Sequence, residues 1–194
     1  MGRGVKVGLK NIHYSTLTTD TIDTIEYGAP VKIAGAITAN INPNSSIDTL
    51  HADDNPFETA ATTGQIELEL NVADLPLAVQ AALLGHTLAA GRMKRSNSAT
   101  PPYVAIGFES LKSNGSKKFI WLYKGKFSEP ENNSQTKGES VEFQTPTITG
   151  SFVAREHDGF WIDEADEDEE GYVASTCGWY TADVLEGTDT PVAG

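Results

Sequence analysis

The residues whose spacing comes closest to a binding motif lie in an acidic run near the C-terminus. Asp166, Asp168 and Glu170 occupy alternate positions and are followed by Gly171. Alternate carboxylates followed by a glycine open an EF-hand loop, in which the carboxylates bind calcium. The twelfth position of that loop requires a bidentate glutamate, but here it is Cys177, and no amphipathic helices flank the run. We interpret the run as a solvated acidic loop, with calcium binding as the alternative.

Catalytic chemistry has less support in the sequence. Cys177 and His157 could form a nucleophile and its base, but one cysteine with a histidine in the same region is weak evidence. No serine stands in a GxSxG motif, and the glycines form no phosphate-binding fingerprint. The histidines lie in separate segments without metal-ligand spacing, at His13, His51, His86 and His157. We predict a protein that is not an enzyme and has no cofactor and no metal site.

The composition bounds the size and the partners. A chain of 194 residues suits one domain with extensions. The formal net charge of -13 gives an acidic surface, which disfavours sequence-independent binding to nucleic acid. If DNA is a partner at all, such a surface suits a wall along which it slides without binding. The single cysteine excludes an intrachain disulfide.

The sequence also predicts a protein made in the cytoplasm and not inserted in a membrane. No apolar run is long enough to cross a bilayer. The N-terminus lacks the apolar centre of a signal peptide. Lys6 stands where an N-myristoylation signal has serine or threonine.

The elements that must position any site are predicted to centre on one β-hairpin. Two apolar runs, 103–111 and 118–127, are joined by a turn at Asn114-Gly115. Asn-Gly between apolar runs is a strong hairpin signal, because both residues tolerate positive φ. The second run is apolar on both faces, since Trp121 and Tyr123 alternate with isoleucine and leucine. A strand covered on both faces belongs in a sandwich or under a helix.

The remaining patterns predict a mainly β fold with one helix. Apolar and polar residues alternate over 31–41 and 65–71, and a further strand is expected over 141–155. Residues 74–84 show helical spacing and end at Gly85, a residue that commonly terminates helices. We expect a β-sandwich or barrel with one flanking α-helix.

A long insert, residues 42–64, separates the strands 31–41 and 65–71. Two prolines and several turn-forming residues predict a long inter-strand loop. Loops of this length are uncommon in compact domains unless they are functional or disordered. Leu50 and Phe57 need somewhere to be buried, and we expect another subunit to provide that place.

Taken together, several segments resemble the major tail tube proteins of long-tailed, non-contractile bacteriophages. They run in order over most of the chain and comprise VGLKNIHYSTL, YGAPVKIAGAITANI, LHADDNPFE, the Leu84-Gly85 that follows the helix, PPYVAIGFES, FIWLYKGKF with Pro130, Thr136-Lys137-Gly138, and TPTITGSFVAREHDGFW. The ordered set carries the resemblance, which thins after Trp161.

The resemblance implies a structural virion protein with a tail-tube-type β-sandwich and one flanking helix. Such proteins close into hexameric rings, which stack into a tube around the tape measure protein. The genome later passes through the tube without specific binding. The implied partners are further copies of the chain, the tape measure protein, and the tail terminator and distal tail proteins. The implied location is the tail tube of the virion, assembled in the host cytoplasm.

The resemblance also assigns roles to particular segments. It implies that the insert contacts adjacent subunits, through residues such as Leu50, His51, Asp53, Asp54 and Phe57. We further expect the polar strand faces to line the lumen, with Glu67, Glu69 and Glu142 near the channel, where acidic walls repel phosphates.

We divide the chain into three parts. Residues 1–28 are an N-terminal arm and first strand region, residues 29–160 the tail tube β-sandwich domain, and residues 161–194 an acidic C-terminal segment. The start of the first part is expected either to fray or to pack on a neighbour.

A monomeric carbohydrate- or ligand-binding β-sandwich is the competing hypothesis. Its aromatic platform would consist of Trp121, Tyr123, Trp161 and Trp179. Core packing is the preferred interpretation of these aromatic residues.

Overall fold

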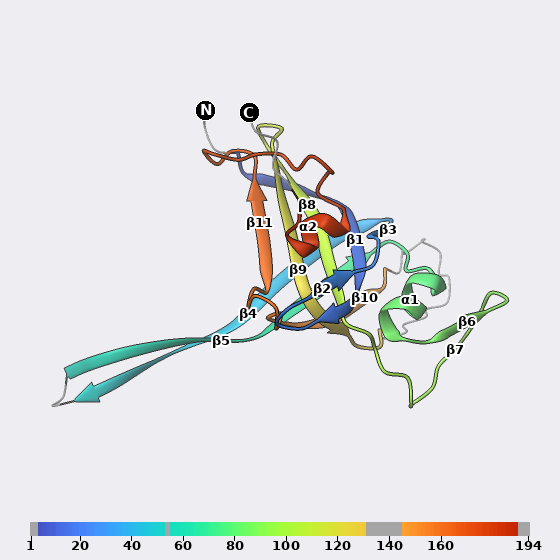
Figure 1. The fold of residues 1–194 in the computed structure, drawn as a ribbon, viewed down its shortest axis with the longest axis horizontal. Helices are drawn as coiled ribbons and strands as arrows, with labels where there is room; N and C mark the ends of the chain where they lie inside the picture. The colour runs from blue at the N-terminus through green and yellow to red at the C-terminus, as the bar shows by residue number, and fades with distance from the viewer. Residues whose placement is uncertain (1–3, 53–54, 131–144, 190–194) are drawn as a thin grey trace, which may run out of the picture.

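Antiparallel strands make up most of the structure, a computed structural model that describes residues 4–52, 55–130 and 145–189 (Figure 1). The strands are β1 Lys6–Asp20, β2 Ile25–Tyr27, β3 Val31–Ile33, β4 Ala36–Ala52, β5 Asn55–Val72, β6 Thr87–Ala89, β7 Arg92–Lys94, β8 Val104–Lys112, β9 Lys117–Phe127, β10 Thr147–Val153 and β11 Ile162–Asp166. The helices are α1 Leu77–Leu84 and α2 Ala182–Glu186. The mainly β prediction is confirmed.

One antiparallel sheet contains all the strands except β6 and β7, which pair with each other. Its order is β2-β1-β8-β9-β10-β5-β4, while β3 pairs with β1 and β11 pairs with β9. The strand β1 pairs with β8 within the same chain and is not a frayed leader.

The predicted central hairpin, β8 and β9, lies between two hydrophobic cores. On one face, Ile120 and Leu122 of β9 join a core that includes β1, β5, β10 and α1. On the other face, Trp121 and Tyr123 join a second core with β2 and α2. All four side chains are buried. The period-2 alternation therefore assigned the faces of β9 correctly.

The strand predicted over residues 31–41 is two strands with different partners. β3 pairs with β1, whereas β4 pairs with β5. The chain changes direction at Gly35, whose φ of 79° favours glycine. A bulge between Ala36 and Thr38 then shifts the register, and Ile37 is left 45% exposed instead of facing the core.

The insert predicted as a loop is an extended β-hairpin. The strands β4 and β5 continue to pair through residues 42–64, up to Ala52 opposite Asn55. Proline is tolerated at Pro43 and Pro56 because this hairpin has unpaired outer edges. Figure 1 shows the hairpin extending away from the rest of the molecule. We call residues 44–52 and 55–65 the hairpin arm.

The helix α1 begins later than its pattern predicted. It starts at Leu77 after Pro76, and Asp74 makes no cap. It ends at Gly85, whose φ of 73° provides the expected left-handed C-cap. Val79 and Leu83 pack into the first core. No helix in the described ranges is long and apolar enough to cross a membrane.

The C-terminal segment adds two elements that its sequence pattern did not predict. β11 pairs along the first half of β9, and α2 places Val184 and Leu185 in the second core. The three-part division of the chain stays a prediction, although strands from all three parts share one sheet.

Candidate assembly surfaces

A polar face is built from four neighbouring strands, β9, β10, β5 and β4. Their registers align the side chains in rows across the sheet. One row contains Lys126, Ser151, Glu67 and Asn42. The next contains Thr149, Glu69 and Asn40, and a third contains Thr147, Asn71 and Thr38. The polar face therefore spans the whole width of this half of the sheet.

The strand β5 shows why one face is polar and the other apolar. Glu67 and Glu69 are exposed, whereas Ile66, Leu68 and Leu70 between and beside them are buried. A one-residue slip would bury both carboxylates, so the core determines which face they occupy. The third predicted lumen residue, Glu142, lies outside the described residues.

Cations limit the polar face at its β9 side. The ammonium groups of two lysines lie over the ring of Tyr103, with Nζ of Lys126 4.4 Å and Nζ of Lys124 5.0 Å from the ring centroid. Lys124 also forms an ion pair of 2.6 Å with Asp20. Burial lowers the pKa of Lys124, but the hydrogen bond and charge of Asp20 outweigh it, so the pKa lies above its ordinary value. These lysines are engaged, while the two glutamates of β5 face solvent.

The hairpin arm carries the residues predicted to contact other subunits. Leu50 pairs with Glu58 and His51 with Pro56, close to the tip, and Phe57 lies on the same part of β5. Asp53 and Asp54 lie outside the described residues. No third strand pairs with the described part of the arm, because β10 pairs with β5 only over Ile66–Asn71.

Two strand edges lie open beside a hollow. In the described chain β4 has no ladder partner beyond β5, and β1 has none beyond β8 over Lys6–Lys10. A hollow of about 630 Å³ separates these edges, with Phe108, Ile120 and Trp161 among its lining residues. Exposed edges of this kind invite pairing with another chain.

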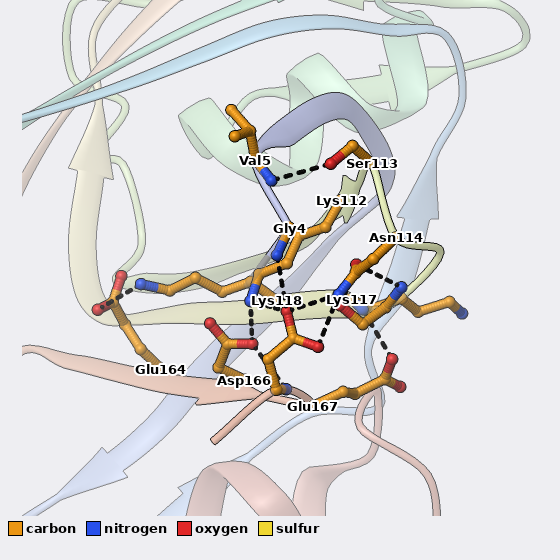
Figure 2. A network of polar contacts seen from close by, with 12 residues as sticks. Gly4, Val5, Lys112, Ser113, Asn114, Lys117, Lys118, Glu164, Asp166 and Glu167 are labelled. Carbon is orange, nitrogen blue, oxygen red and sulfur yellow. Dashed lines mark hydrogen bonds and ion pairs between the residues drawn. The ribbon is translucent and has the colours of Figure 1, made fainter. Parts of the chain in front are cut away.

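The acidic run is held by a buried lysine, as Figure 2 shows. Lys112, at the end of β8, is 6% exposed and forms ion pairs with Asp166 and, at 2.8 Å, with Asp168. The side-chain amide of Asn114 donates to both Asp168 oxygens, at 2.9 and 3.0 Å. The backbone N–H of Gly4 donates to the same carboxylate at 3.3 Å. The network therefore joins the N-terminus, the β8–β9 turn and the end of β11.

This network shifts the pKa values of its members, and it bears on the alternative that the acidic run binds calcium. Hydrogen bonds from Lys112 hold the pKa of Asp166 and of Asp168 below the ordinary range, and the two carboxylates raise the pKa of Lys112. The oxygens that an EF-hand would use bind an ammonium group instead. Among the described residues, no group of His, Cys, Asp and Glu could hold a metal ion. The sequence did not reveal Lys112 as their partner.

The other residues considered for chemistry are placed as follows. Trp121 and Tyr123 are 0% and 6% exposed, so they cannot form a carbohydrate-binding platform. Trp121 instead donates its Nε1 hydrogen to the carbonyl of Trp179 at 3.0 Å. Cys177 is exposed, and in the described chain no hydrogen bond joins it to His157, whose Nδ1 contacts the Ile22 carbonyl at 3.1 Å.

Comparison with known proteins identifies the family of the chain. No curated protein matches the chain. The family model for phage tail tube protein matches residues 9–188, which include every described strand except the start of β1. That family is a structural, non-enzymatic one, and its members are components of the virion tail. The chain belongs to the phage tail tube protein family.

Proposed function

We propose that copies of this chain close into hexameric rings and that the rings stack into a tail tube through which the genome is delivered. Head-to-tail contacts around a ring close it, and stacking of rings gives an open filament. The open edges of β4 and β1 support sheet pairing between copies, which would remove them from solvent.

The hairpin arm is the observation that carries this proposal. Its two strands pair only with each other, and Ile47 on β4 is 69% exposed. A two-stranded hairpin without a third strand or a packed face is marginally stable in water. The arm therefore needs a surface that the described part of its own chain does not supply, and a neighbouring copy in the same or the next ring provides it. Leu50, His51 and Phe57 are the proposed contact residues, together with Asp53 and Asp54.

The polar face is proposed to line the lumen. Glu67 and Glu69 point away from the core, and Glu142 keeps the lumen role predicted from the sequence. Acidic walls repel phosphates, so DNA passes without binding. The proposed partners are further copies, the tape measure protein, and the tail terminator and distal tail proteins, with assembly in the host cytoplasm.

Shortening the arm tests the assembly role. Deletion of residues 45–63 joins Asn44 to Gly64 and leaves a short turn of a kind that suits hairpins. The body of the protein should keep its fold, because the described residues in this range pair only within the arm. We expect wild-type protein to form rings or tubes in negative-stain electron microscopy over a concentration series, and the shortened protein to stay monomeric. Tubes formed equally well by the shortened protein, with an unchanged circular dichroism spectrum, would refute the role of the arm.

A charge reversal tests the lumen assignment. Glu67→Lys/Glu69→Lys should permit tube assembly but impair DNA ejection, because cationic walls bind phosphates. The matched control is Asp23→Lys/Glu26→Lys, which makes the same change in charge at two exposed positions outside the polar face. Normal assembly and normal ejection by the Glu67→Lys/Glu69→Lys phage would refute the assignment.

A further inference from the structure

A short hairpin formed by β6 and β7 projects from the body beyond α1 (Figure 1). Its turn has positive φ at both central residues, 51° at Ala90 and 74° at Gly91, as in the type I′ turns that join twisted strands. Leu88 pairs with Met93 across the two strands. With three residues in each strand, this hairpin is too small to be stable without external support.

The base of the β6–β7 hairpin is anchored while its tip is not. Arg95, directly after β7, forms an ion pair of 3.1 Å with Glu129 and donates to Gln80 of α1 at 3.3 Å. His86, directly before β6, contacts the same Glu129. These contacts hold both ends of the hairpin against the body and determine its direction.

Two cations occupy the free part of the hairpin. Arg92 and Lys94 are exposed, and neither side chain forms a hydrogen bond or an ion pair with any other described residue. Leu88 beside them is 38% exposed. The protein carries 14 basic against 27 acidic residues, so an exposed cationic hairpin is a local exception. Its charge complements an anionic surface.

An anionic surface of this kind lies elsewhere on the same chain. A hollow of about 430 Å³ beyond β11 has four carboxylates in its lining, from Glu164, Asp166, Glu169 and Glu170, and one cation, Lys118, which pairs with Glu164 at 3.0 Å. Glu167 is exposed next to it. Figure 1 places the β6–β7 hairpin at the right and the turn after β11 at the upper left, with the central strands between them. The two surfaces are therefore available to meet between copies.

We propose that the β6–β7 hairpin of one copy docks on the acidic hollow beyond β11 of a second copy. The contact is heterologous, since the two surfaces differ, and it therefore propagates from copy to copy. It rests on the proposed self-assembly and adds a contact distinct from the hairpin arm. A protein partner is favoured over DNA because two cations on a chain of net charge -13 give little attraction for phosphates.

Charge reversal with rescue tests the docking. Arg92→Glu/Lys94→Glu should raise the concentration needed for tube assembly about tenfold or more, and Glu167→Lys/Glu170→Lys should do the same. Combining the four changes should restore assembly, because the charges are exchanged across the same contact. The control, Lys32→Glu, reverses one charge at an exposed position on β3, outside the open edges, the hairpin arm and the polar face, and should have a smaller effect. Thermal unfolding of each variant shows that the monomer is folded.

A cross-link provides a second measurement. Cys177 is the only cysteine, so a Cys177→Ala background can carry Met93→Cys and Glu170→Cys together. Oxidised tubes should then give a ladder of covalent oligomers on a non-reducing gel, and each single-cysteine variant should not.

The outcomes separate this inference from the proposed function. Wild-type protein that never assembles would overturn both. If the wild type forms tubes, the Arg92→Glu/Lys94→Glu variant assembles equally well and no cross-link forms, only the docking proposal is overturned. If the wild type binds DNA in a salt-sensitive way, and the Arg92→Glu/Lys94→Glu variant loses this binding but assembles normally, the docking proposal is overturned in favour of a phosphate-binding hairpin.

Discussion

Phe152 of β10 and Gly125 of β9 form a contact whose energetics can be predicted from the structure. Phe152 is 0% exposed, and it lies opposite Gly125 in the β9–β10 ladder. A Cβ added at Gly125 would lie 2.4 Å from Cδ1 of the Phe152 ring. The ring also meets Phe127 edge-on, with centroids 5.9 Å apart. Because Gly125 has no side chain, it leaves the space in which the Phe152 ring lies.

Each single substitution should therefore destabilise the protein by a different mechanism. Phe152→Ala should lower the free energy of unfolding by about 3–5 kcal/mol, because it leaves a cavity in the core. Gly125→Ala should lower it by about 1–3 kcal/mol through overpacking. Independent effects would together give about 4–8 kcal/mol. The double variant should lose less than this by about 0.5–3 kcal/mol, because the new methyl group enters the space left by the ring.

Urea unfolding, at protein concentrations below the onset of assembly, measures the four corners of this cycle. Gly8→Ala is the matched control, since among the described residues its Cβ would have one neighbour within 4 Å, Leu111 Cβ at 3.9 Å, and its change should be additive with Phe152→Ala. Additive effects in the Gly125–Phe152 cycle would refute the packing described for the first core. Coupling in the Gly8 cycle would show that the method detects something other than direct contact.

Three further substitutions test other parts of the structure. Lys112→Met should reduce the stability of the protein at neutral pH. In the wild type, the lowered pKa of Asp168 means that its carboxylate stabilises the folded state. This stabilisation is present above the ordinary pKa of about 4 and is lost as the pH falls through the lowered pKa. Acid titrations should therefore show a smaller loss in the variant. Arg155→Met should lower the free energy of unfolding by about 1.5–3 kcal/mol, because the Arg155 guanidinium donates a hydrogen bond to the carbonyl of Leu185, in the last turn of α2, at 2.6 Å. Limited proteolysis of the variant should then begin in the C-terminal segment. Gly85→Ala should destabilise the protein more than Gly91→Ala. Both glycines have positive φ, but only a Cβ at Gly85 would meet a backbone oxygen, at 2.5 Å. Equal losses of stability would mean that φ alone matters.

Local patterns were sufficient to predict the fold class and the central hairpin. Alternation placed Trp121 and Tyr123 on one face of β9 and the aliphatic residues on the other, and both faces proved buried. Gly85 marked the end of the helix. These features depend on the period of side chains along a strand or helix, which a short window of sequence contains. The resemblance that the ordered segments carried agrees with the family match.

Features that depend on distant partners needed the tertiary structure. A loop and an extended hairpin share the same turn-forming residues over 42–64, and only the register between β4 and β5 distinguishes them. The acidic run looked like a calcium loop or a solvated turn until Lys112, more than 50 positions away, proved to bind Asp166 and Asp168. The period of a sequence thus determines which face a side chain occupies, but the closure of the sheet decides which other residues it meets there.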